Sequence, residues 1–200
     1  MQMNKMKSLF LLLNCLFVCF SGCIIPESNH IEPDFYLLSE TKLENNDSNA
    51  SGNFSFYLRE IELPRYLKDP RMVYRPTEHT VEFRESKRWG EPLEDGIARA
   101  ISLNLYNKSP GSRFSIFPNL RKDNLRWDIS ISFSSFEKVS GHTLVDAQWS
   151  AKDKSGVFMA GKYSSELIAL KTKDVADELN NYNQALHDLA GAIIQDLSSK

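Results

Sequence analysis

The stretch LRWDISISF, residues 125–133, decides the fold class of this chain. Every second side chain from Leu125 to Phe133 is apolar, and the residues between them are charged or serine. This strict alternation predicts a strand with one face on a core and the other in water, which is typical of antiparallel sheets. The pattern returns in VDAQWSA, residues 145–151, after Ser140-Gly141. We therefore predict a hairpin of two strands joined by a longish loop, followed by a third strand over 157–168.

Outside the hairpin, shorter strands and two helices are predicted. Strands are expected at 35–38, over roughly eight residues ending at Pro64, and at 72–75 and 79–86. Apolar residues spaced by four follow Pro92, and apolar residues recur every three or four positions from Val175 to Leu197, after Asp174 as a cap. The expected fold class is α+β: an antiparallel or mixed sheet with two amphipathic helices packed on one face, in a single domain.

All three cysteines lie in the first 23 residues, at positions 15, 19 and 23. Lys5 and Lys7 precede the apolar run LFLLLNCLFVCF, residues 9–20. A membrane-spanning helix needs about 20 apolar residues, so this run is too short to span and instead fits the apolar region of a secretory signal. Small residues then lead directly into Cys23.

The tetrapeptide Phe20-Ser21-Gly22-Cys23 resembles the lipobox of bacterial lipoproteins. The resemblance implies that residues 1–22 are a signal peptide that is removed and that Cys23 is the lipid attachment site. Residues 23–33 would then be a lipid-anchored tether, followed by one domain over 34–200 with a mobile loop at 39–53. Ile24, rather than aspartate, follows the cysteine, which by resemblance to the enterobacterial sorting rule favours the outer membrane. The alternative is an ordinary signal peptide with an incidental cysteine.

Composition excludes several classes of function. Without Lys5 and Lys7 the mature chain is mildly acidic, which argues against nucleic-acid binding. GVFMAGKYS, residues 156–164, nearly matches a phosphate-binding loop, but Tyr163 replaces the required hydroxyl residue and the segment has a strand pattern. The four histidines have no metal-ligand spacing. We therefore expect no enzyme activity, no metal and no cofactor.

Three motifs in the first half of the chain resemble those of the ABC-type transport auxiliary lipoprotein family, the PqiC-like proteins. They are Phe35-Tyr36-Leu37-Leu38, the run from Leu63 to Arg75 (LPRYLKDPRMVYR), and Arg88-Trp89-Gly90-Glu91-Pro92-Leu93. A looser resemblance continues through Val145-Asp146-Ala147-Gln148-Trp149 and the last helix. Lys68-Asp69 and Gly90 depart from the usual residues of the family.

The resemblance implies a non-catalytic lipoprotein subunit of an envelope transport system for lipids or other hydrophobic solutes. Its partners would be a mammalian-cell-entry-type substrate-binding protein, an inner-membrane permease and the outer membrane, with self-association as a further expectation. Arg88 and Trp89 are candidate partner contacts. Their structural alternative is that Trp89 caps the core and Arg88 bonds a nearby oxygen. The alternative function is a stand-alone periplasmic lipoprotein with a structural or ligand-binding role.

Overall fold

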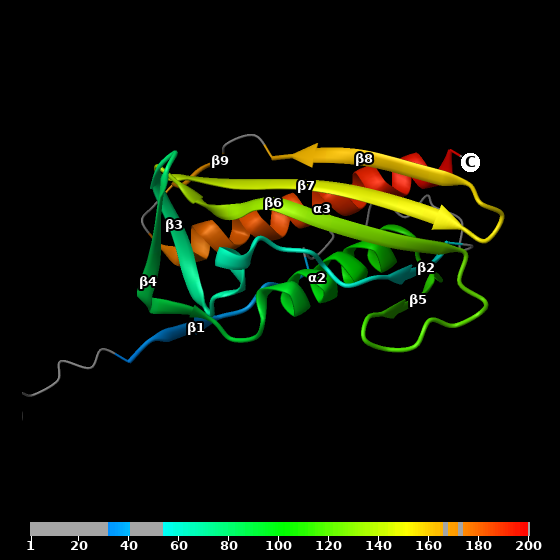
Figure 1. The fold of residues 1–200 in the computed structure, drawn as a ribbon, viewed down its shortest axis with the longest axis horizontal. Coiled ribbons are helices and arrows are strands. Elements are labelled where there is room, and N and C mark those ends of the chain that lie inside the picture. The colour runs from blue at the N-terminus through cyan, green and yellow to red at the C-terminus, as the bar shows by residue number, and fades with distance from the viewer. Residues whose placement is uncertain (1–31, 41–53, 166–167, 172–173, 200) are drawn as a thin grey trace, which may run out of the picture. The chain divides into compact units, whose positions relative to one another are not determined.

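The computed structural model describes residues 32–40, 54–165, 168–171 and 174–199, and the part from Pro33 onward forms one compact unit. The described residues of this unit form a nine-stranded mixed sheet and two α-helices, α2 (Leu93–Lys108) and α3 (Val175–Ser198), which lie on the same face of the sheet (Figure 1). The strands are β1 (Asp34–Tyr36), β2 (Ser55–Leu58), β3 (Arg71–Thr77), β4 (Thr80–Trp89), β5 (Arg113–Ile116), β6 (Trp127–Val139), β7 (His142–Asp153), β8 (Phe158–Ser164) and β9 (Ile168–Ala169). The predicted α+β class is confirmed, and the sheet is mixed.

The hairpin of β6 and β7 is the centre of the sheet. Its antiparallel register runs from Trp127 opposite Asp153 to Val139 opposite His142. The turn is only Ser140-Gly141, with φ values of 45° and 85°. Positive φ at both central residues matches the right-handed twist of a two-residue hairpin. The prediction of a longish loop is therefore wrong.

A β-bulge interrupts the alternation of buried and exposed residues in the second half of β6. The register shifts between Phe133 and Ser135, so Ser134 is an extra residue opposite no partner. Beyond it, Ser135, Phe136 and Glu137 are buried in succession. One inserted residue breaks the two-residue period of burial, which is why the sequence pattern stops at Phe133 while the strand continues.

Each central strand carries two short strands end to end on its outer edge. β7 occupies one edge of β6 over its whole length, so β2 and β3 must share the other edge, where both pair parallel to β6. On β7 the edge opposite β6 carries β8 and β9. β5 pairs with β2, β4 with β3, and β1 with β4.

The short strands differ most from prediction. β2 covers only Ser55–Leu58, and the chain then follows β6 irregularly through a single bridge at Glu62 before the 3-10 helix Arg65–Lys68. β5 was not predicted, because four residues of which two point inward give too short a pattern. The predicted strands at 72–75 and 79–86 correspond to β3 and β4.

The two helices match their predicted ranges closely. α2 follows Pro92, and α3 follows Asp174, whose side chain accepts a hydrogen bond from the backbone N–H of Ala176 at 3.2 Å. α3 presents Tyr182, Leu186 and Leu189 to the core, and all three are almost fully buried. The Tyr182 ring stacks on Phe136 of β6 with centroids 4.5 Å apart, which joins the helix to the bulged half of the hairpin.

Candidate functional site

Several predicted features lie outside the described residues. They are Cys23, the signal peptide and most of the tether, and residues 41–53 of the predicted mobile loop. Lipid attachment at Cys23 and the division of the chain into signal, tether and domain therefore stay predictions.

Arg88 and Trp89 end β4 in different environments. Trp89 is buried, with ring centroids 6.2 Å from Tyr182 and 6.4 Å from Phe136, and its backbone N–H donates to the Pro70 carbonyl at 2.7 Å. Arg88 is half-buried and lies opposite Arg71 in the register. Its Nε is buried and has no hydrogen-bond partner among the described residues. Trp89 thus occupies the core position that the structural alternative gives it, whereas the partner contact predicted for this pair stays a prediction.

The family-like run from Leu63 to Arg75 surrounds a buried carboxylate that the sequence did not indicate. Glu137 of β6 is fully buried. An Arg75 Nη2 lies 2.6 Å from its Oε1, and the Tyr66 hydroxyl donates to its Oε2 at 2.7 Å. Burial, with this hydrogen bond, raises the pKa of Tyr66 well above its usual value, so the phenol stays a donor at neutral pH. The sequence carries no local signal for this group, because the bulge at Ser134 breaks the alternation before Glu137.

A second buried carboxylate joins the β3–β4 hairpin to α3. Glu178, 1% exposed, lies 2.7 Å from an Nη1 of Arg84 and accepts a hydrogen bond from the Tyr182 hydroxyl at 3.2 Å. Burial raises the pKa of Tyr182. Arg75 of β3 thus pairs with a buried glutamate of β6, and Arg84 of β4 pairs with a buried glutamate of α3. The two ion pairs fix the β3–β4 hairpin to the sheet and to the helix.

Arg71 fixes the turn that leads into β3. Its guanidinium donates to both oxygens of Asp69 at 2.9 Å and to Glu85 at 2.5 Å, and it lies 4.6 Å from the centre of the Phe83 ring. The hydrogen bonds from Arg71 lower the pKa of Asp69 to about 2. Asp69 occupies a position where this chain departs from the usual family residues, and here it serves the turn.

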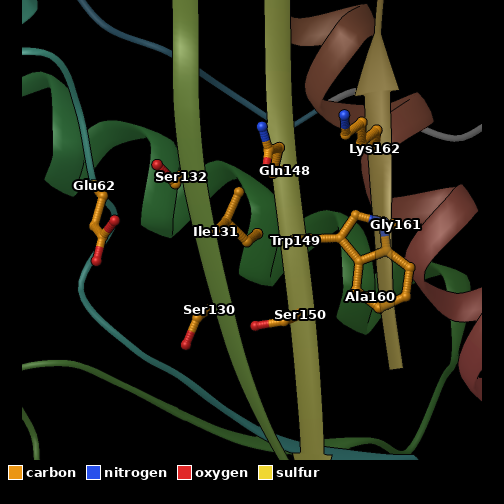
Figure 2. A pocket seen from close by; sticks show the side chains of 10 residues that line it. All are labelled: Glu62, Ser130, Ile131, Ser132, Gln148, Trp149, Ser150, Ala160, Gly161 and Lys162. Atoms are coloured by element: carbon orange, nitrogen blue, oxygen red, sulfur yellow. The ribbon is translucent and has the colours of Figure 1, made fainter. Parts of the chain in front are cut away.

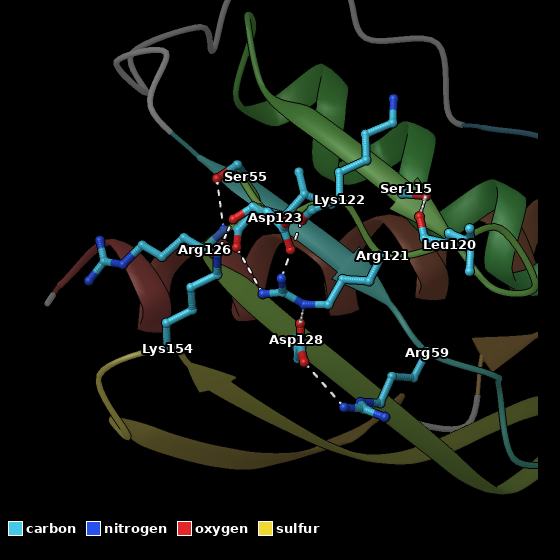
Figure 3. A network of polar contacts seen from close by, with 11 residues as sticks. Ser55, Arg59, Ser115, Leu120, Arg121, Lys122, Asp123, Arg126, Asp128 and Lys154 are labelled. Carbon is cyan, nitrogen blue, oxygen red and sulfur yellow. Dashed lines mark hydrogen bonds and ion pairs between the residues drawn. The ribbon is translucent and has the colours of Figure 1, made fainter.

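A polar network fastens the connection from β5 to β6 (Figure 3). Asp128 of β6 bonds Arg121 with one oxygen and Arg59 with the other, the latter at 3.1 Å. Arg121 also donates to the carbonyl of Leu125 at 2.9 Å, and Arg126 N–H donates to the Ser55 hydroxyl at 3.1 Å. These contacts hold the segment before β6 against β2.

The sheet face opposite the helices carries a shallow cleft of about 490 Å³ (Figure 2). Small side chains form its floor, and longer polar ones stand at its sides. The lining residues are Glu62, Ser130, Ile131, Ser132, Gln148, Trp149, Ser150, Ala160, Gly161 and Lys162. Such a surface offers a partner both hydrogen-bonding groups and apolar area.

Among the described residues there is neither a cluster of metal ligands nor a membrane-spanning helix. No three His, Cys, Asp or Glu side chains of the described ranges lie together in a way that could hold a metal ion. In the same ranges, no helix is long and apolar enough to cross a membrane.

Comparison with known proteins decides the family. The model of a family described as "ABC-type transport auxiliary lipoprotein component" matches residues 36–194. The chain belongs to this family. The match includes all three motifs on which the resemblance was based, apart from Phe35, and both buried carboxylates.

Two curated relatives support the assignment. The Escherichia coli protein named intermembrane transport lipoprotein PqiC is 20% identical over 181 residues, which are 90% of this chain and 88% of that protein. The Shigella flexneri protein of the same name matches equally well. Both relatives are named as intermembrane transport lipoproteins.

Solved structures share the fold. A crystal structure of an uncharacterized protein superposes with a TM-score of 0.69 at 14% identity, covering 83% of this chain and 99% of the other. Protein XCC0632 from Xanthomonas campestris superposes with a TM-score of 0.64 at 12% identity, covering 84% of this chain and 99% of the other. At these identities the likeness concerns the fold alone.

Proposed function

We propose that this chain is a non-catalytic lipoprotein subunit of an envelope transport system of the ABC, mammalian-cell-entry type. In this role it links the system to the outer membrane during transport of lipids or other hydrophobic solutes. The observation that carries the proposal is the family match over 159 positions, residues 36–194, together with an intermembrane transport lipoprotein as a relative over 90% of the chain.

The buried polar groups support a function that depends on contact with other proteins. Glu137 and Glu178 are each neutralised by an arginine and bonded by a tyrosine, so they stabilise the fold rather than face a substrate. Function would then depend on the surface and on the anchor, whose site is Cys23. Residues 1–22 would be the removed signal, 23–33 the tether, and 34–200 the domain that faces the periplasm.

The anchor is tested by the mass of the protein purified from membranes. The wild-type protein is expected to lack residues 1–22 and to carry added acyl mass on Cys23. Cys23→Ala is expected to keep the signal and to remain at the inner membrane. A mature form that starts at another residue, or one that carries no lipid, would contradict the anchor.

The partners are tested by cross-linking in intact cells, followed by mass spectrometry. We expect recovery of a mammalian-cell-entry-type protein, a permease of the inner membrane, and other copies of this chain. Among the family-motif residues Arg88 is the better position for a photo-reactive amino acid, because Trp89 is buried. The same amino acid at Lys154, on the β7–β8 turn, is the control. If only unrelated envelope proteins are recovered from cells that express the partner, the stand-alone role replaces this one.

A further inference from the structure

The uncovered face of the sheet has an ordered arrangement of charges. Glu62 lies opposite Ser132, Ser132 opposite Gln148, and Gln148 opposite Lys162, so the four residues form one row across the β2 side, β6, β7 and β8. Figure 2 shows these side chains on the cleft side of the sheet. The row therefore has a carboxylate at one end, an ammonium group at the other, and a hydroxyl and an amide between them.

Two further rows flank or line the cleft. Ser130, Ser150 and Ala160 are mutually opposite and form the small-residue row next to the first. The third row joins Tyr57, Asp128, Lys152 and Phe158. Phe158 is 64% exposed, so this row ends in an aromatic ring at the β8 side and in another at the β2 side.

The charges of the first row are available for a partner. All four of its side chains are exposed. Within the described part of the chain, neither Glu62 nor Lys162 takes part in an ion pair. The backbone of Glu62 is nevertheless fixed, because its N–H donates to Ile131 and its carbonyl accepts from Phe133, at 3.1 and 2.9 Å. The carboxylate thus stands on a fixed backbone at the rim of the cleft.

We propose that this face binds the same face of a second copy of the chain. A two-fold axis that runs along the strands, between β6 and β7, exchanges the β2 side of one copy with the β8 side of the other. Glu62 then faces Lys162 of the second copy, Ser132 faces Gln148, and Tyr57 faces Phe158, each contact occurring twice. A two-fold axis across the strands would instead bring the first row over the third and would match none of these charges.

The dimensions suit such a contact. Stacked sheets pack about 10 Å apart, a gap that a glutamate and a lysine from opposite sides can bridge. Serine and alanine in the middle row leave room for the backbones to approach and for bridging water. Asp128 is already paired with Arg59 and Arg121 within its own copy. The Glu62–Lys162 pair should therefore contribute more to the contact between the copies than a pair with Asp128.

The contact is small, four strands by three rows, so we expect an association at the weak end of specific interfaces, which bury under about 1,200 Å² in total. Anchoring of both copies in one membrane would raise their effective concentration. The inference rests on the self-association in the proposed function and adds the surface that carries it.

The test uses two differently tagged copies of the full chain expressed in the same cells and co-purified in mild detergent. Wild-type copies are expected to capture each other. Glu62→Lys and Lys162→Glu, each placed in both copies, are expected to reduce capture roughly tenfold, because each change sets like charges opposite one another twice. Copies carrying both changes should recover capture, since the facing charges are again opposite. Glu82→Lys, an exposed change of the same sign on β4, is the control and should leave capture unchanged.

Each contrary outcome overturns a different statement. Capture that survives both single reversals, or that the double change does not restore, overturns this face but leaves self-association in place. Absence of capture between wild-type copies overturns self-association itself. The link to a mammalian-cell-entry partner is judged separately, by the cross-linking described above.

Discussion

Removing Arg75 should destabilise the protein far more than removing an ordinary surface arginine. Glu137 is fully buried, and its described contacts are an arginine nitrogen at 2.6 Å and a tyrosine hydroxyl at 2.7 Å. In Arg75→Met the carboxylate keeps only the hydroxyl of Tyr66. Breaking a buried ion pair on one side costs about 3–5 kcal/mol in the free energy of unfolding, because an uncompensated charge remains inside.

The assay is urea unfolding of the unit from Pro33 onward, followed by tryptophan fluorescence. With an m-value of about 2 kcal/mol per molar urea, a loss of about 4 kcal/mol lowers the midpoint by about 2 M. A triple variant, Arg75→Met with Glu137→Met and Tyr66→Phe, removes all three polar groups together. Because apolar replacement of a whole buried pair is often nearly neutral, this variant should recover most of the loss.

Arg59→Met is the matched control. This arginine also pairs with a carboxylate, that of Asp128, but its side chain is 57% exposed, so its loss should cost at most about 1 kcal/mol. The reasoning is refuted if Arg75→Met shifts the midpoint no more than Arg59→Met does. It is equally refuted if the triple variant is less stable than the single one.

Three other changes test the packing and the charges. Leu186→Ala should lower the free energy of unfolding by about 2–5 kcal/mol through lost burial and a residual cavity. Calorimetry of both proteins measures this loss, and equal stability would contradict the burial of Leu186. Gly161→Ala should cost about 1–3 kcal/mol, because the added methyl carbon would lie 2.6 Å from Nε1 of Trp149; a melting temperature equal to that of wild type would contradict the placement of the indole. Since Arg71 lowers the pKa of Asp69 in the folded state to about 2, Asp69 stabilises the fold above its unfolded pKa of about 3.9, and this contribution is lost as the pH falls toward 2. The melting-temperature difference between wild type and Asp69→Asn should therefore shrink between pH 4 and pH 2, and a constant difference would argue against the pair.

The sequence predicted those elements whose burial follows a regular period. LRWDISISF and the apolar positions of α3 are long enough for one face to be recognised, and both are found where they were expected. The pattern fails where a single residue changes the register. The bulge at Ser134 interrupts the pattern, so the last five residues of β6, 135–139, and the tight turn at Ser140-Gly141 were not recognised.

The site was less accessible from sequence than the fold. The family motifs indicated that Leu63 to Arg75 and Arg88 to Leu93 are important. They did not indicate the buried carboxylate that the first of these runs surrounds. Glu137 and Glu178 look like ordinary surface glutamates until Arg75 and Arg84 are brought to them from segments 62 and 94 positions away in the chain. The row from Glu62 to Lys162 depends on strand register, which no local pattern encodes.

The shared edge of β6 has a consequence for the order of folding. β2 and β3 both pair with β6, and their partners lie 71 and 64 positions later in the chain, at Phe56 with Trp127 and Tyr74 with Lys138. Neither strand can join the sheet until β6 exists, whereas β6 and β7 are joined by a two-residue turn and can pair locally. Closing such long loops costs entropy before the contacts form, which slows folding. During synthesis from the N-terminus, the β3–β4 hairpin can pair locally, but β2 and the free edge of β3 stay without their partner strand until β6 emerges.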